Sequence, residues 1–117
     1  MPDLPDVAYK VLTSEQMAAL ERDGSFAGAP VDLADGYIHM STADQLTETV
    51  DKHFAGQTGL HIVAIDLGSF GESLKWEPSR GAQLFPHLYE PLRLETAIAY
   101  GPLERDGDGA VRLPVAG

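Results

Sequence analysis

Cysteine is absent from the 117-residue chain. Its absence excludes disulfides, thiolate zinc sites and a cysteine nucleophile. Basic residues are also few, because 8 Lys and Arg stand against 18 Asp and Glu, for a formal net charge of -10. Tight contact with nucleic-acid phosphates or anionic lipid needs Lys and Arg. We therefore expect no nucleic-acid partner and no membrane partner.

Long hydrophobic runs are missing as well. No apolar stretch approaches the ~18–20 residues of a membrane span, and residues 1–6 lack the basic and apolar parts of a signal peptide. We therefore expect a cytoplasmic protein. The chain is nonetheless 44% hydrophobic, which suits one folded domain over residues 1–117. We expect a loose N-terminus at 1–6 and a core at about 7–113.

The elements are short, and Pro and Gly separate them. Helices are expected from Thr13 to about Gly24, through a Thr13–Gln16 capping box, and from Ser41-Thr42 to Gly56. Asp106-Gly107-Asp108-Gly109 predicts a C-terminal hairpin whose edge strand covers 110–113. The other expected strands are 7–12, 37–40, 60–67, 73–77, 84–89 and 96–103. Strands outnumber helices without regular alternation, which predicts an α+β fold.

The first group of unusual polar residues covers 37–42. Tyr37 and His39 share one face of the expected strand, and His39 stands directly before a helix N-terminus, where an anion is favoured. Ser41 or Thr42 would line that place. The structural alternative is equally concrete, because Thr42 with Gln45 forms a capping box and His39 can be a hydrogen-bonded histidine of the sheet.

The second group is Trp76 and Glu77. An aromatic ring beside a carboxylate can form a pocket wall, and Glu77 could act as a general base or orient His39 or His87. The alternative is a core tryptophan next to a solvated glutamate. Both interpretations remain open from the sequence.

The third group is His87 and Tyr89, which alternate with an apolar residue and could face one side together. Prolines on both sides of the pair restrict the backbone. His53, near the end of a helix, and His61, inside an apolar strand, are interpreted as structural. No metal-binding motif is present, so no metal site is expected.

Four segments together resemble a family of small bacterial and plant domains known as a domain of unknown function, over about residues 9–100. The segments are Gly36-Tyr37-Ile38-His39-Met40-Ser41-Thr42, Ile65-Asp66, Leu74-Lys75-Trp76-Glu77 and Phe85-Pro86-His87-Leu88-Tyr89. That family is grouped with the ADP-ribosyltransferase-like fold. The resemblance implies a split antiparallel or mixed β-sheet core with two main helices.

Within that fold group, the segment around His39 is similar to the His-x-His-Leu-Ser stretch of NAD-dependent RNA 2′-phosphotransferases. By this resemblance, His39 and Ser41 would line a nucleotide cleft beside Lys10 of the first strand, with NAD or a related nucleotide as cofactor. Glu77 is the nearest counterpart of the glutamate of toxin-type transferases. Those phosphotransferases place several arginines around the histidine, and this sequence has none at the corresponding positions.

The sequence leaves three hypotheses open, together with the oligomeric state. The first is an NAD- or nucleotide-related transferase or hydrolase, the second is a non-catalytic module for a small ligand or a protein, and the third is a hydrolase with a His–Glu pair. Under the first, the catalytic residues are His39, Glu77 and His87, and the cofactor-binding residues are Lys10, His39, Ser41, Thr42, Trp76 and Tyr89. In the second, Trp76, Phe85, His87 and Tyr89 form the pocket wall. All three require His39, Glu77, His87 and Tyr89 to converge.

Overall fold

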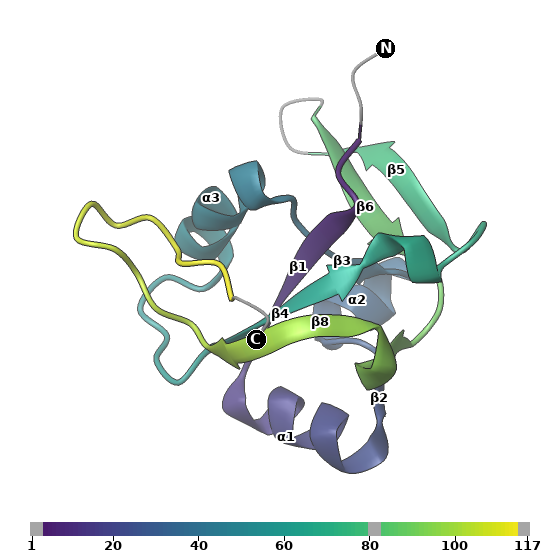
Figure 1. Ribbon diagram of the computed structural model, residues 1–117, viewed down its shortest axis with the longest axis horizontal. Helices are drawn as coiled ribbons and strands as arrows, with labels where there is room; N and C mark the ends of the chain where they lie inside the picture. Colours follow the sequence, from purple (N-terminus) through teal and green to yellow (C-terminus); the bar gives the residue numbers. More distant parts are fainter. Residues whose placement is uncertain (1–3, 80–82, 115–117) are drawn as a thin grey trace.

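The structure is a computed structural model that describes residues 4–79 and 83–114. It is a single α+β domain (Figure 1). The helices are α1 (Ser14–Asp23), α2 (Pro30–Asp35) and α3 (Ala43–His53), with short 3-10 turns at Leu67–Ser69 and Leu94–Thr96. The strands are β1 (Val7–Leu12), β2 (Ser25–Phe26), β3 (Ile38–His39), β4 (His61–Asp66), β5 (Leu74–Pro78), β6 (Leu84–Leu88), β7 (Leu92–Arg93) and β8 (Ala97–Pro102). None of the described helices is long and apolar enough to cross a membrane.

The strands form two three-stranded sheets and one small pair. The sheets have the orders β1-β4-β8 and β3-β6-β5, β2 pairs with β7, and every pairing is antiparallel. The two larger sheets meet at one point, where the amide and carbonyl of Tyr9 bond those of Ser41 at 2.8 and 3.0 Å. The backbone after β3 is therefore held against the middle of β1, and this junction positions the site.

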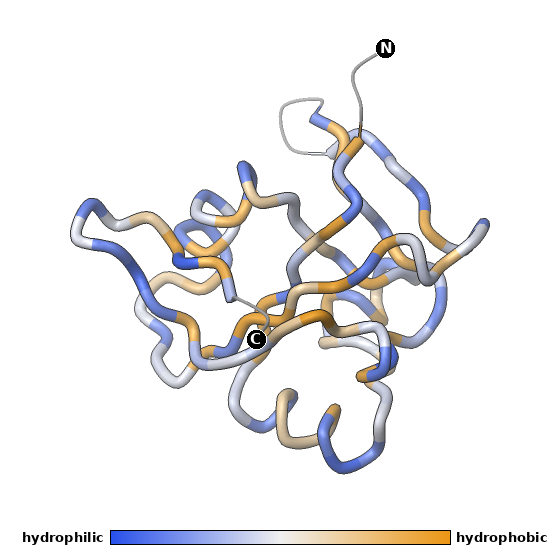
Figure 2. The backbone as a smooth tube through the Cα atoms, viewed as in Figure 1, coloured by the Kyte–Doolittle hydropathy of each residue, from blue (hydrophilic) through white to orange (hydrophobic). Residues whose placement is uncertain are grey.

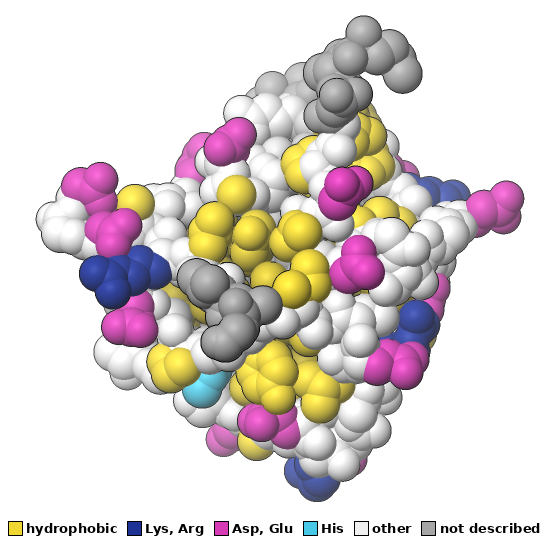
Figure 3. Space-filling view, in the orientation of Figure 1, with side chains coloured by type: hydrophobic (Ala, Val, Ile, Leu, Met, Phe, Trp, Pro, Cys, Tyr) yellow, Lys and Arg dark blue, Asp and Glu magenta, His cyan; other side chains and the backbone are white. Residues whose placement is uncertain are grey.

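The core lies on both faces of the β1-β4 pair. Leu12 and Val63 pack with α1 on one face, whereas Val11 and Ile62 pack with α3 on the other. Burial on both faces explains why 60–67 reads as a nearly continuous apolar run. Hydrophobic segments accordingly gather toward the middle of the molecule (Figure 2). Acidic side chains are scattered over the face drawn in Figure 3, as the net charge implies.

Helix α1 begins and ends where the sequence predicts. The Thr13 hydroxyl accepts from the Gln16 amide at 3.2 Å, the Gln16 side chain accepts from the Thr13 amide at 2.9 Å, and Gly24 ends the helix at φ 74°. The predicted end of α3 is wrong. The helix stops at His53, and Gly56 (φ 76°) lies in the following turn, which the Gln57 amide closes on the Phe54 carbonyl at 3.1 Å.

The C-terminal prediction is correct only for the turn. The Asp106 amide donates to the Ala110 carbonyl at 2.8 Å, but pairing is limited to one bridge, between Arg105 and Val111. No edge strand covers 110–113, although the structure describes all four of these residues. Val111 instead packs against the α3 side of the core, so this arm is anchored by a side chain rather than by a strand.

The predictions for the ends of the chain are partly outside the described residues, which exclude 1–3 and 115–117. Within the expected loose segment, the carbonyl of Asp6 accepts from the Leu67 amide at 2.9 Å. Three elements were not expected from the sequence, namely helix α2 and the two short paired strands β2 and β7. Of these, α2 contributes to the site. It carries Pro at its first position and is followed by Gly36 at φ 87°.

Candidate functional site

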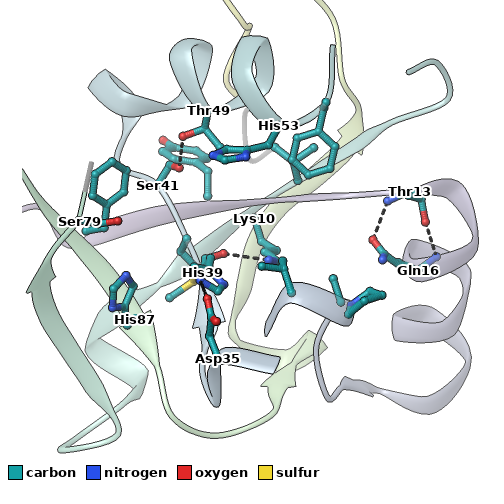
Figure 4. Close-up of a pocket in the computed structure, with 18 of the residues that line it drawn as sticks. Lys10, Thr13, Gln16, Asp35, His39, Ser41, Thr49, His53, Ser79 and His87 are labelled. Carbon is teal, nitrogen blue, oxygen red and sulfur yellow. Dashed lines mark hydrogen bonds and ion pairs between the residues drawn. The ribbon is translucent and has the colours of Figure 1, made fainter. Parts of the chain in front are cut away.

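A groove of about 580 Å³ opens where the two larger sheets meet (Figure 4). Its volume falls within the ~300–1,000 Å³ typical of small-molecule sites. In the close-up, His39 and His87 lie along one side, whereas Ser41, Thr49 and His53 lie along the other. The polar residues of the lining include Lys10, His39, Ser41, Thr49, His53 and His87.

His39 is held from both ends of its ring. Its Nδ1 lies 2.7 Å from Asp32 Oδ1, and its Nε2 lies 2.9 Å from Asp35 Oδ2. The main-chain amide of His39 also donates to Asp32, at 3.0 Å. Both carboxylates come from α2, which lies just before β3. The sequence prediction that His39 lies at a strand end is correct, but the sequence analysis did not identify either of its carboxylate partners.

Asp32 is 1% exposed and forms a buried ion pair with Lys10. The Lys10 ammonium lies 3.1 and 2.9 Å from the two carboxylate oxygens and donates to the His39 carbonyl at 2.9 Å. Asp32 also accepts from the Ala29 amide at 2.8 Å. Lys10 therefore has an acceptor for each of its three protons. This pair fixes α2 to β1 and β3 at the base of the groove.

Burial and charge oppose each other in this pair. Burial alone would raise the pKa of Asp32, but hydrogen bonds from His39 and the Lys10 charge outweigh it and hold that pKa below its usual range. Burial lowers the pKa of Lys10, and its attraction to Asp32 only partly offsets that effect. Asp32 is therefore a buried carboxylate that stays ionised through its partners.

His87 forms the second histidine–carboxylate pair. Its Nδ1 lies 2.9 Å from Glu77 Oε1, which also accepts from the Tyr89 hydroxyl at 2.7 Å. The hydrogen bond from Tyr89 and, after it, the one with His87 lower the pKa of Glu77. The Tyr89–Glu77 hydrogen bond also raises the pKa of Tyr89 to about 12. Tyr37 stacks on His87 with ring centroids 4.1 Å apart. Among the described residues, no hydrogen bond reaches His87 Nε2.

The two pairs lie side by side. His39 and His87 are direct cross-strand partners between β3 and β6, and their ring centroids are 5.7 Å apart. Tyr37 contacts both rings and also Tyr89. The four residues that all hypotheses required to converge are therefore in one place. His39 and His87 line the groove, whereas Glu77 and Tyr89 stand behind His87.

Ser41 and Thr42 have different surroundings. The Ser41 hydroxyl lies 2.8 Å from that of Thr49 and lines the groove. Thr42 does not line it, and its amide donates to the Gln45 side chain at 3.0 Å. Gln45 in turn donates to the Leu84 carbonyl at 2.8 Å. The capping interpretation therefore accounts for Thr42.

Trp76 is not brought to this group. It alternates with Glu77 along β5, so the two side chains leave opposite faces of the strand. Trp76 packs against the hydrophobic core and does not line the groove. Of the two interpretations of Trp76, the core tryptophan therefore matches the structure, and the pocket-wall residue does not. Of the other two aromatic residues of the expected wall, Phe85 lines the groove, whereas Tyr89 does not.

Four residues near the groove escaped the sequence analysis as site residues. Asp32 and Asp35 had a readable signal, because Pro30 with an acidic residue two positions later marks a first helical turn and Gly36 marks its end. Tyr37 was noted only as sharing the His39 face. His53 was interpreted as structural, but lies in the groove wall. His61, at the start of β4, does not line it.

The charges in the groove limit what it can hold. Lys10 is the one lysine among the described lining residues, no arginine occurs among them, and Lys10 is already paired with Asp32. Among the described residues, no group of three or more His, Asp or Glu is arranged to hold a metal ion. Imidazole rings and hydroxyls therefore make up most of the polar groups that line the groove.

Comparisons with known proteins identify the family but not an activity. A crystal structure of protein CC0527 from Caulobacter crescentus is similar at a TM-score of 0.83 and 43% identity, covering 92% of this chain and 94% of that chain. The solution NMR structure of CC0527 gives a TM-score of 0.77 at 43% identity, covering 90% of each chain. No curated protein sequence matches. The DUF952 profile, described as a protein of unknown function, matches residues 11–100, and the chain belongs to this family.

Proposed function

We propose that the groove binds NAD or a related nucleotide and that the chain is a transferase or hydrolase of the ADP-ribosyl type. The split arrangement of two three-stranded antiparallel sheets, with α1 and α3 packed on them, is compatible with the ADP-ribosyltransferase-like grouping implied by the motifs. Fold likeness does not assign an activity, so the proposal rests on the site.

The arrangement of His87 carries the proposal. One ring nitrogen is anchored by Glu77, so the ring keeps one orientation while forming part of the groove wall. A histidine oriented by a carboxylate is suited to take up or release a proton at its other nitrogen. In this proposal, His87 supplies acid–base help, Glu77 and Tyr89 orient it, and His39 with Ser41 holds the ligand.

Release of nicotinamide from NAD tests this proposal. We expect slow release by the wild-type protein and a loss of about 100-fold or more in His87→Ala. Glu77→Gln should retain the fold and lose activity in the same direction. His61→Ala is the matched control, because His61 is also part of a strand but lies outside the groove lining. Equal rates in the His87 and His61 variants would contradict the proposal.

A non-catalytic binding module is the second candidate. The observation that favours it is the described lining, which offers no arginine for a pyrophosphate and includes the aromatic residues Tyr9, Phe54 and Phe85. In this case His39→Ala and His87→Ala would weaken ligand binding, and no variant would alter any turnover. The His–Glu hydrolase differs again, because it requires turnover of esters or phosphoesters that Glu77→Ala abolishes.

A further inference from the structure

The two carboxylates that contact His39 are held very differently. Asp32 is buried and accepts from Lys10, from two main-chain amides and from the His39 ring. The Asp35 side chain is 47% exposed, and its one described hydrogen bond is to His39 Nε2. The Asp32 side of the ring is therefore fixed, whereas the Asp35 side is open to exchange.

The position of Asp35 weakens its contact further. Asp35 is the last residue of α2, where the backbone carbonyls disfavour a negative charge. An exposed ion pair of this kind contributes little to stability. A solute that supplies a better acceptor for His39 Nε2 would therefore meet little resistance from Asp35.

Charge counting gives the chemistry of such a solute. Both ring nitrogens of His39 face carboxylate oxygens, and both can donate only when the ring carries two protons. In that state, the positive charges of His39 and Lys10 exceed the negative charge of Asp32 by one. Asp35 cancels this excess in the free protein. Once Asp35 moves away, the group of His39, Lys10 and Asp32 keeps one positive charge, and the N–H at His39 Nε2 can donate to a ligand anion.

We propose that Asp35 occupies the place of a ligand phosphate on His39 Nε2 and is displaced when that phosphate binds. Both residues line the groove, so the exchange would occur within the ligand site. The inference rests on the proposed function in one respect, namely that the groove receives a nucleotide-type molecule. It assigns a phosphate subsite to His39 and makes Asp35 the residue that sets its affinity.

Titration with inorganic pyrophosphate tests the subsite without any turnover. We expect Asp35→Asn to bind pyrophosphate about two- to fivefold more tightly than the wild-type protein, because the competing carboxylate is gone. Asp23→Asn is the matched control. Asp23 is also an exposed acid at a helix end, but it pairs with Arg22 and does not line the groove. This control should bind like the wild type.

A double variant separates displacement from general repulsion between anions. If Asp35 acts through His39, the gain from Asp35→Asn disappears in a His39→Gln background. In the wild-type protein, pyrophosphate should shift the NMR signal of His39 Nε2 more than that of Nδ1. A gain that persists without His39, an equal gain in Asp23→Asn, or no binding by either protein would each overturn the inference. None of these results depends on nicotinamide release, so the proposed function can fail separately.

Discussion

His39 and His87 are neighbours across two strands, but the protein holds them in opposite ways. His39 has a carboxylate on each ring nitrogen, and its side chain is 32% exposed. The His87 side chain is 4% exposed and has one carboxylate, with no partner for Nε2 among the described residues. A ring held at both nitrogens is suited to binding. A ring held at one nitrogen keeps the other available for proton transfer.

The carboxylates that contact Nδ1 of the two rings, Asp32 and Glu77, differ in the same sense. Asp32 is buried in an ion pair that joins three elements, whereas Glu77 is partly exposed at the surface of β5. Loss of Asp32 should therefore affect stability first, and loss of Glu77 should affect activity first. The following predictions test this division.

The largest effect is expected from Asp32→Ala. This change leaves the buried Lys10 ammonium without its ion-pair partner, which typically costs about 3–5 kcal/mol. Urea unfolding measures the loss. Glu77→Ala should cost clearly less, because the Glu77 side chain keeps access to water. Equal losses of unfolding free energy in the two variants would contradict the assignment of a structural role to Asp32 and a supporting role in turnover to Glu77.

The next effect concerns turnover. His87→Ala should lower kcat by about 100-fold or more, since it removes the acid–base group. His39→Gln should instead raise KM with a smaller change in kcat, because His39 is assigned to bind the substrate and the transition state equally. Steady-state kinetics of nicotinamide release separates the two parameters. A fall in kcat confined to the His39 variant would reverse the assigned roles.

Acid should expose the contribution of Asp32. Its folded-state pKa lies below the ordinary value, so the ionised form stabilises the fold. This contribution is complete above the unfolded pKa of about 4 and declines as the pH falls through that value toward the folded pKa. We expect the urea midpoint to drop between about pH 5 and about pH 2, and Asp32→Asn to flatten the drop. An unchanged slope in this variant would contradict the assignment.

The smallest effect is at Tyr89. Its hydrogen bond to Glu77 raises its pKa to about 12, so the neutral hydroxyl stabilises the fold below about pH 10 and this contribution is lost as the pH rises through about 12. Ultraviolet titration should show Tyr89 ionising at about pH 12. In Glu77→Gln, its midpoint should move toward the ordinary value of about 10. An unchanged midpoint in this variant would contradict the role of the Glu77 hydrogen bond.

The sequence predicts local features of this fold better than it predicts contacts between residues that are distant in the chain. Alternation along 37–40 correctly separates Tyr37 and His39 from the buried Ile38 and Met40, and the capping box correctly starts α1. These features depend on residues near one another in the chain. The weak pairing after Arg105 depends instead on where Val111 packs, which no local pattern encodes.

The same limit applies to the site. The sequence predicts that His39, Glu77, His87 and Tyr89 converge, and the structure brings them together. It does not predict the Lys10–Asp32 pair, because the two residues are 22 positions apart and belong to different elements. Trp76 shows the converse error. The sequence predicts it as a cofactor-binding residue beside Glu77, but Glu77 contacts His87 on one face of the strand and Trp76 packs against the core on the other.

The central claim is that the groove is a nucleotide site with His39 and His87 on its wall. NMR titration of the intact protein with NAD tests it most directly. The account predicts saturable shifts at His39, His87 and Ser41, with no shift at His61. Absence of any shift at about millimolar NAD, or shifts confined to residues outside the groove, would contradict it.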